Sequence, residues 1–246
     1  MNEILKNISN LKTTRSNNFC EDKISNEDLE IILQSSVRAP NASNRQSYSI
    51  IILNEKEQEE LGLKGDKVLL YVIDFYRHEC LKKYLGSNVS FEHFQPFITG
   101  IIDVSLAIQN AVIAANSLNI GYLVTNDTYT KDLEKIFSLF QLPQKGCFPL
   151  LYLCLGYPKD KSMKQKSRID IKHIVHRGKY KDYSQDEINS ILNEYNNHEL
   201  ELFTNWKENG YKNYLDWFYN KWTPALEKKE KSLKLLKTIR NIGFLD

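Results

Sequence analysis

Residues 38–46 read Arg38-Ala39-Pro40-Asn41-Ala42-Ser43-Asn44-Arg45-Gln46, and after Ser47 the chain enters the apolar run Tyr48-Ser49-Ile50-Ile51-Ile52-Leu53. Proline, asparagine and serine favour a turn, whereas a short apolar run rich in isoleucine predicts a buried strand. A polar loop that enters a rigid strand places amide and hydroxyl groups where they can hydrogen-bond a polar heterocycle. The stretch therefore predicts a cofactor-binding loop at the mouth of a sheet.

The composition predicts one sizeable core in a cytoplasmic protein. The chain has 246 residues, 41% of them hydrophobic, and its formal net charge is only +2. So small a charge gives no field that would attract nucleic acid or an acidic membrane, so we expect neither as a partner. The longest apolar stretch, residues 97–118, is interrupted by Asp103 and several polar side chains, which is typical of a core helix. Residues 1–20 lack a secretory apolar region, and the four cysteines show no disulfide framework.

Helices and buried strands alternate along the first two thirds of the chain. We expect helices at 3–10, between Ser25 and Pro40, and at 55–61, 95–118 and 131–140, with strands at 48–53, 68–74, 122–125 and 147–156. Residues 159–170 read as a surface loop. Residues 184–240 are helical and rich in aromatic side chains, which either line a pocket for a planar substrate or form a helix-packing core. We expect a single domain over 1–246, with 184–240 as a helical excursion.

Several motifs in a fixed order resemble one known family. Residues 38–46 resemble the A-P-S-x-x-N-x-Q-P signature of the FMN-dependent nitroreductases, with Asn41 in place of the serine and Ser47 in place of the last proline. Four further motifs of the family have counterparts in the same chain order. Lys12-Thr13-Thr14-Arg15 resembles its R-S-x-R box, and Gly100 to Gly121 resembles its central helix. Phe148 to Pro158 resembles its F-P-L strand, and Lys166-Ser167-Arg168 resembles its late K-P-R motif. With Asp74-Phe75-Tyr76-Arg77-His78 and Val175-His176, they suggest the branch of NADPH-preferring, oxygen-insensitive nitroreductases and flavin reductases.

The resemblance implies a fold, a cofactor and a reaction. The fold would be α+β, a nitroreductase-like mixed β-sheet flanked by helices, in a homodimer that holds two FMN molecules at its interface. The reaction would be ping-pong: NADPH or NADH reduces the flavin, and a nitroaromatic, a quinone or free flavin then takes two electrons. No side chain need be an obligatory acid or base, because the flavin carries the chemistry. The alternatives are a reductase or dehydrogenase of one small metabolite, and a flavin-binding protein without turnover.

The resemblance also assigns residues to the two ends of the cofactor. Cations and a hydroxyl suit the phosphate dianion, and the positions that match are Lys12, Thr13, Arg15, Lys166 and Arg168. Pro40, Asn41, Ala42 and Asn44 would approach the flavin of the partner subunit, whereas Val124, Thr125, Asn126 and Asp127 would lie along the ring near N5. The family usually has Gly-Gly where this chain has Asn126-Asp127. A carboxylate there would lower the reduction potential of the flavin unless it points away.

Other chemistry finds little support in the sequence. His78, His173 and His176 have no carboxylate or cysteine at metal-ligand spacing, so we predict no metal site. The serines and Cys154 lack a nucleophile elbow or an adjacent base, which argues against a hydrolase. Residues 62–67 contain only part of a phosphate loop and read as a turn.

Overall fold

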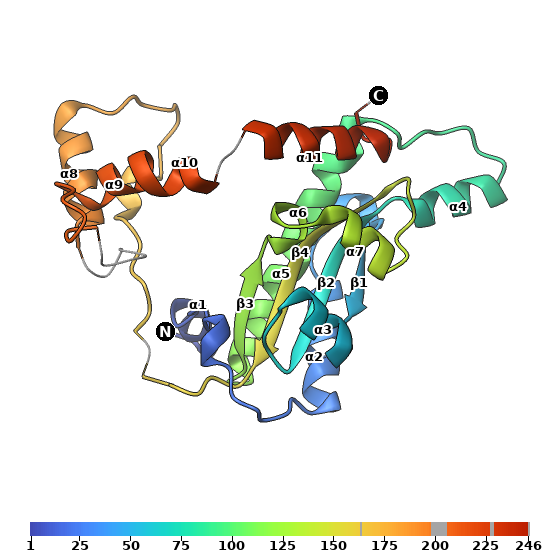
Figure 1. Cartoon of the computed structure of the whole chain (residues 1–246), viewed down its shortest axis with the longest axis horizontal. Helices are drawn as coiled ribbons and strands as arrows, with labels where there is room; N and C mark the ends of the chain where they lie inside the picture. The colour runs from blue at the N-terminus through green and yellow to red at the C-terminus, as the bar shows by residue number, and fades with distance from the viewer. Residues whose placement is uncertain (163, 198–205, 227–228, 246) are drawn as a thin grey trace. The chain divides into compact units, whose positions relative to one another are not determined.

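The computed structural model describes residues 1–162, 164–197, 206–226 and 229–245, and its chain divides into two compact units. Unit 1 comprises Met1–Met163 and Leu233–Asp246, and unit 2 comprises Lys164–Ser232 (Figure 1). The expectation that 1–246 form one nitroreductase-like domain with an excursion at 184–240 stays a prediction.

Unit 1 is built on a four-stranded sheet. Its strands, in spatial order, are β1 (Tyr48–Ile52), β2 (Lys67–Asp74), β4 (Cys147–Gly156) and β3 (Gly121–Thr125). All three neighbouring pairs are antiparallel. The α+β class is confirmed, but the prediction of a mixed sheet is wrong for the described strands. The mixed sheet was implied by the family resemblance. The apolar runs themselves predicted only buried strands, because burial says nothing about the direction in which neighbouring strands run.

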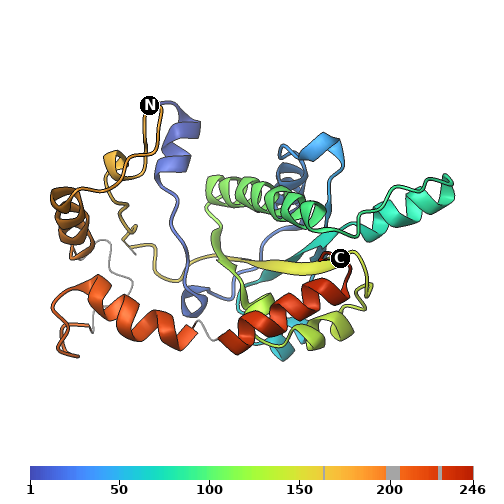
Figure 2. The same cartoon turned by 90° about the horizontal axis from the view of Figure 1, so that it is seen from above.

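Helices cover both faces of this sheet. They are α1 (Glu3–Ser9), α2 (Asn26–Val37), α3 (Glu55–Leu61), α4 (Tyr76–Tyr84), α5 (Phe94–Ser117), α6 (Asp127–Thr130), α7 (Leu133–Leu139) and α11 (Lys229–Asn241), which enters unit 1 at Leu233. Figure 2 shows α5 along one face and α7 and α11 along the other. On the first face, the Ser36 hydroxyl of α2 bonds to Tyr71 of β2 at 2.9 Å. On the second, Thr128 Oγ1 of α6 donates to the Leu150 carbonyl of β4 at 2.6 Å.

The predicted helix boundaries follow from local signals. Ser25 accepts a hydrogen bond from the Asp28 N–H and begins α2, as the cap pattern predicted. Asn54 and Glu57 form a capping box on α3, and Gly62 ends it in the left-handed conformation at φ 66°. The strand at 147–156 has the predicted bounds. Strong local signals therefore fix most of unit 1.

Helix α5 is the core helix of unit 1. It is the described helix that is long and apolar enough to span a membrane, yet half of its most apolar window is buried within the fold. Gly100 allows it to approach β2, because a Cβ there would overlap the Ile73 side chain. One stripe of α5 stays exposed among the described residues of unit 1. Its apolar members are four residues apart, and they are Phe94, Ile98, Ile102 and Leu106, each 38–53% exposed.

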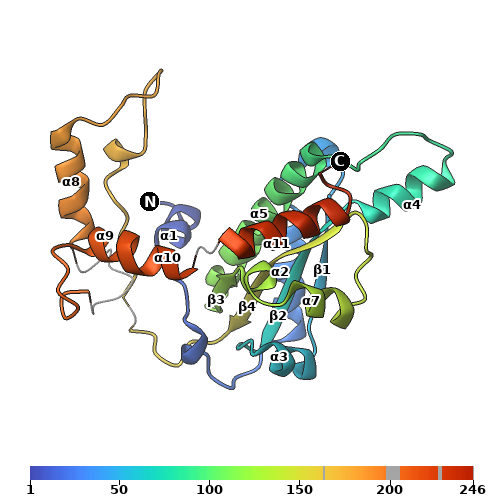
Figure 3. The ribbon, with the colours of Figure 1, turned by 45° about the horizontal axis from the view of Figure 1, so that its top comes forward.

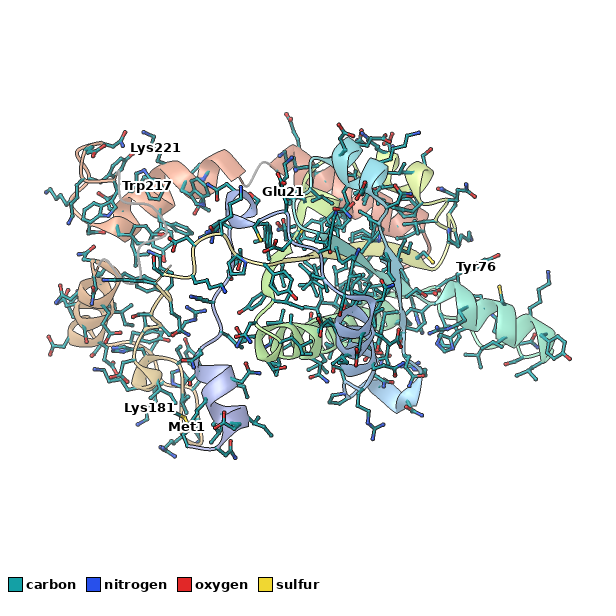
Figure 4. All side chains as sticks on the ribbon, turned by 90° about the horizontal axis from the view of Figure 1, so that it is seen from below. Met1, Glu21, Tyr76, Lys181, Trp217 and Lys221 are labelled. Carbon is teal, nitrogen blue, oxygen red and sulfur yellow. The ribbon has the colours of Figure 1, made fainter. Side chains whose placement is uncertain are left out.

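Helix α4 is not among the expected elements. It follows β2 directly and extends away from the body of unit 1 in Figure 3, and Figure 4 labels Tyr76 where it begins. None of its residues is buried, so it shows no apolar stripe for periodicity to find. Its first turn is held by Asp74, whose carboxylate accepts the Arg77 N–H at 3.1 Å.

Unit 2 has its own small apolar cluster. The elements of unit 2 are α8 (Gln185–Tyr195), α9 (Tyr214–Trp217), a π-helical turn (Phe218–Trp222) and α10 (Thr223–Leu226). Trp206, Tyr214, Leu215 and Trp217 are buried together, with the Trp217 and Trp222 rings stacked at 5.8 Å. This favours the helix-packing interpretation of the aromatic side chains. Of the predicted helical segment, 198–205, with Phe203, and 227–228 lie outside the described residues.

Candidate functional site

The loop between α2 and β1 has an unusual backbone. Ser43, Asn44 and Gln46 adopt φ angles of 55°, 55° and 46°, in the left-handed region that non-glycine residues usually avoid. Asn41 braces the loop from inside, since its Oδ1 accepts the Gln46 N–H at 3.0 Å. The side-chain amide oxygen of Asn41 therefore bonds within the loop itself.

Two helices hold this loop from outside. Asp103 of α5 is fully buried, and its two carboxylate oxygens accept the N–H groups of Ala42 at 3.0 Å and Ser47 at 3.3 Å. From α4, Arg77 donates to the carbonyls of Gln46 and Tyr48. The loop is thus bound through both its donors and its acceptors.

His78 adds a bond to the same loop from α4. Its Nε2 lies 3.1 Å from the Arg45 carbonyl, and because a carbonyl only accepts, the ring nitrogen must donate. Burial chiefly, and then the charge of Arg77, lowers the pKa of His78. The neutral imidazole is therefore favoured in the folded state.

Among the predicted residues of this loop, Asn44 is the one best placed to meet a ligand. It is exposed, and its Oδ1 accepts from Gln46 Nε2 at 2.6 Å, which orients the amide. Pro40 is also exposed, whereas Asn41 and Ala42 are half-buried. A pre-oriented amide on a fixed backbone suits the hydrogen-bonding edge of a heterocycle.

The N-terminal box docks on the opposite edge of the sheet. Thr14 is buried and its N–H donates to the Tyr122 carbonyl of β3 at 2.8 Å, so the exposed Thr13 and Arg15 flank it. Lys12 donates through Nζ to the Lys161 carbonyl at 2.9 Å. Lys12, Thr14 and Lys161 are among the residues that line a hollow of about 650 Å³. The box thus offers two cationic side chains and a hydroxyl beside β3.

The end of β3 carries the next predicted group. Val124 and Thr125 are half-buried, and Asn126 donates to the Tyr129 hydroxyl at 3.2 Å. The Asp127 carboxylate pairs with Lys131 at 2.7 Å across one turn. The negative charge that replaces the usual glycine therefore has a cation partner.

The box and the end of β3 belong to one strip of the sheet. The Thr14 N–H donates to the Tyr122 carbonyl, and Thr125 lies three residues further along β3, a distance of about 10 Å. A cofactor with a phosphate at one end and a ring at the other fits such a strip. The structure therefore brings Lys12, Thr13 and Arg15 into line with Val124 to Asp127.

The loop at 40–47 lies far from that strip in the same chain. The strand register aligns Tyr48 of β1 with Ile73 and then with Phe148 of β4, whereas Tyr122 of β3 aligns with Leu155. From Tyr48 to Tyr122 the separation is seven residues along β4 and three strand spacings, roughly 25 Å. From Tyr48 to Thr125, which aligns with Tyr152, it is four residues and three spacings, roughly 20 Å. One small cofactor cannot contact both within a single chain.

The last predicted pair lies in unit 2. Lys166 and Arg168 are exposed, and Arg168 Nη1 donates to the carbonyls of Lys166 and Ser167 at 3.0 and 2.9 Å. The guanidinium of Arg168 thus bonds to the backbone of the two residues that precede it. That this pair shares a phosphate with Lys12 and Arg15 stays a prediction.

Sequence reasoning did not assign a role to Asp103, Arg77, His78 or Lys131. Signals for three of them were present: Asp103 is an acid within an apolar helix, and Arg77-His78 belong to a motif after β2. Lys131 gave no signal beyond its spacing of four from Asp127.

Comparisons with known proteins agree with this architecture. No protein-family model matches the chain. An NADPH-dependent oxidoreductase from Staphylococcus saprophyticus is 30% identical over 190 residues, which cover 72% of this chain and 74% of that protein. An FMN reductase (NADPH) from Bacillus subtilis is 28% identical over 207 residues, covering 79% of this chain and 81% of that protein.

Solved structures show the same fold over the whole chain. The nitroreductase NfrA1 from B. subtilis superposes with a TM-score of 0.84 at 25% identity, over 98% of this chain and 99% of that one. The NfrA1 structure from B. megaterium gives a TM-score of 0.83 at 26% identity, over 100% of both chains. With the ordered motifs and the two polar regions of the sheet, these likenesses lead to one conclusion: the chain belongs to the FMN-dependent nitroreductase family, in the branch of NADPH-preferring nitroreductases and flavin reductases.

Proposed function

We propose that the protein is a soluble, cytoplasmic FMN-dependent NAD(P)H oxidoreductase that works as a homodimer and passes two electrons to a small planar acceptor. Relatives named as an NADPH-dependent oxidoreductase and an FMN reductase support the activity. The donor set fits the cofactor, since cations and a hydroxyl suit a phosphate dianion and amides suit a heterocycle. When bound, FMN would supply the two-electron chemistry.

The separation of the two polar regions carries the homodimer proposal. Loop 40–47 and the strip beside β3 lie roughly 20–25 Å apart in one chain, so a second copy must bring its loop to the strip if both contact one flavin. The exposed stripe of α5 gives that second copy an apolar surface to pack against. The residues of this chain would then act in two ways: Lys12, Thr13 and Arg15 bind the phosphate, and Asn44 of the other copy orients the ring.

The first test is spectroscopic. Purified protein should carry releasable FMN, and anaerobic NADPH should bleach its visible absorption. Parallel double-reciprocal plots across several acceptor concentrations would support the ping-pong order. Stable yellow protein that NADPH does not bleach would instead indicate a flavin-binding protein without turnover.

The second test addresses assembly. A ligand that binds only the assembled state stabilises that state by mass action. Adding FMN to apo-protein should shift the midpoint of dimer dissociation to lower protein concentration in sedimentation velocity. A monomer that binds FMN as tightly as the dimer would contradict the shared site.

A further inference from the structure

Residues 41–47 form the strained part of the loop between α2 and β1. Of the five non-glycine residues with positive φ in the described part of the chain, three lie in this loop, namely Ser43, Asn44 and Gln46. Such conformations persist only where the surrounding structure over-determines them, and they concentrate at functional sites. Whatever holds this loop therefore controls the position of Asn44.

Asp103 is the principal restraint. It is 0% exposed in the middle of an apolar helix, and an ionised carboxylate in such a place needs hydrogen bonds to offset its lost hydration. Its two oxygens accept the N–H groups of Ala42 and Ser47, one on each side of the strained residues. A single buried side chain thus fixes both ends of the strained segment.

Helix α4 supplies the complementary restraint. Asp103 accepts from backbone N–H groups, whereas Arg77 and His78 hold backbone carbonyls of residues 45, 46 and 48. The Arg45 guanidinium also lies over the Phe75 ring, 5.8 Å from its centroid, at the start of α4. Helix α5 therefore binds the N–H groups of the loop, and α4 binds its carbonyl groups.

We propose that Asp103, Arg77 and His78 are positioning residues that hold loop 41–47 in its flavin-binding conformation before the cofactor arrives. The inference rests on the proposed function. The bonds that all three side chains make to the loop run to its backbone, so each would act on the flavin through the loop. Binding then needs no reordering of the loop, and the conformational entropy of ordering it is lost during folding. The geometry also explains why an exposed helix such as α4 directly follows β2.

The experiment compares two buried carboxylates. Asp103→Asn keeps the size of the side chain but removes its charge and sets an NH₂ group against a backbone N–H. The matched control is Asp66→Asn, because the Asp66 side chain is 2% exposed and accepts the Ile24 N–H at 2.8 Å, with no bond to the loop. FMN affinity of apo-protein is measured by fluorescence titration, and stability by urea unfolding without FMN.

We expect Asp103→Asn to raise the Kd for FMN about 10- to 100-fold, as for one lost charge-assisted hydrogen bond. Asp66→Asn should lose stability but keep the parental Kd. A folded Asp103→Asn protein with parental affinity, or an equal loss in both variants, overturns the proposal. Failure of the parental protein to bind FMN would instead defeat the proposed function.

Two further variants separate positioning from general stability. Glycine adopts positive φ readily, so Ser43→Gly combined with Asp103→Asn should recover part of the lost affinity, an effect that global destabilisation would not produce. Arg77→Met lies on exposed α4, where folding is not at risk, and should raise the Kd about 3- to 10-fold. Unchanged affinity in Arg77→Met contradicts the proposal even if Asp103→Asn does not fold.

Discussion

The residues predicted for the flavin ring and those predicted for its phosphate are held in very different ways. The ring-side loop at 40–47 is bonded to α4 and α5 through its backbone, and Asp127 at the end of β3 is paired with Lys131. On the phosphate side, Thr13, Arg15, Lys166 and Arg168 are exposed. The guanidinium of Arg168 bonds to carbonyls of its own segment.

The difference assigns separate tasks to the two ends. A ring must be placed accurately for electron transfer, and contacts formed before the cofactor arrives, as we propose for loop 40–47, would place it so. A phosphate dianion is a strong, nearly spherical charge, and long cationic side chains can close on it after it arrives. Phosphate contacts should therefore dominate affinity, whereas ring contacts should tune geometry and potential.

The largest effect should come from the phosphate side. Arg168→Ala should weaken FMN binding by about 1.5–3 kcal/mol, the range for a charge-assisted hydrogen bond, as measured by titration of apo-protein. Lys164→Ala is the matched control, because it removes one exposed positive charge from the same segment without touching a predicted contact. Equal, small effects of the two substitutions would remove Arg168 from the site and leave the phosphate to Lys12 and Arg15.

The second effect concerns the ring side and the flavin potential. Lys131→Met leaves the Asp127 carboxylate unpaired, and an uncompensated anion opposes the addition of negative charge to a nearby ring. The pair is partly exposed and screened, so we expect the potential of bound flavin to fall by only roughly 10–20 mV. Redox titration against a dye of known potential measures the shift.

A neighbouring lysine provides the control for that prediction. Lys135 pairs with Glu60 at 3.2 Å, so Lys135→Met removes the same charge from the same region but leaves Asp127 neutralised. An equal shift in both variants would mean that overall charge, and not the Asp127 pair, sets the potential.

Local signals explain how much of the fold was predictable. The cap at Ser25 and the apolar strand runs located most elements of unit 1, because those signals act within a few residues. Helix α4 was missed because it buries nothing. The mixed sheet came from the family resemblance, since strand direction depends on the whole topology and leaves no local signal. The long-range arrangement of the elements produces no hydrophobic periodicity that could be read from the sequence.

The candidate site divides along the same line. The resemblance identified residues that would touch the cofactor, such as Asn44 and Arg15, because they lie in short motifs. The residues that position them were left without a role, because Asp103 lies 61 positions from Ala42 and Arg77 lies 31 from Gln46. Only the fold joins such pairs.

The smallest effect is a pH dependence from the ring side. Because the pKa of His78 is lowered by burial and by Arg77, the unfolded chain takes up the proton first as the pH falls, with Asp74 and the Arg45 carbonyl partly opposing the shift. The stability that depends on neutral His78 is fully present above its unfolded pKa, near 6.5, and is lost as the pH falls through the folded value.

His78→Gln isolates this contribution, since glutamine can still donate to the Arg45 carbonyl but does not titrate between pH 7 and 5. The thermal midpoint of the parental protein should therefore fall more steeply over that range than that of the variant. The difference should be modest because His78 is only half-buried. Matching pH profiles would show that protonation of His78 does not weaken its hold on the Arg45 carbonyl, and would contradict the predicted pH dependence.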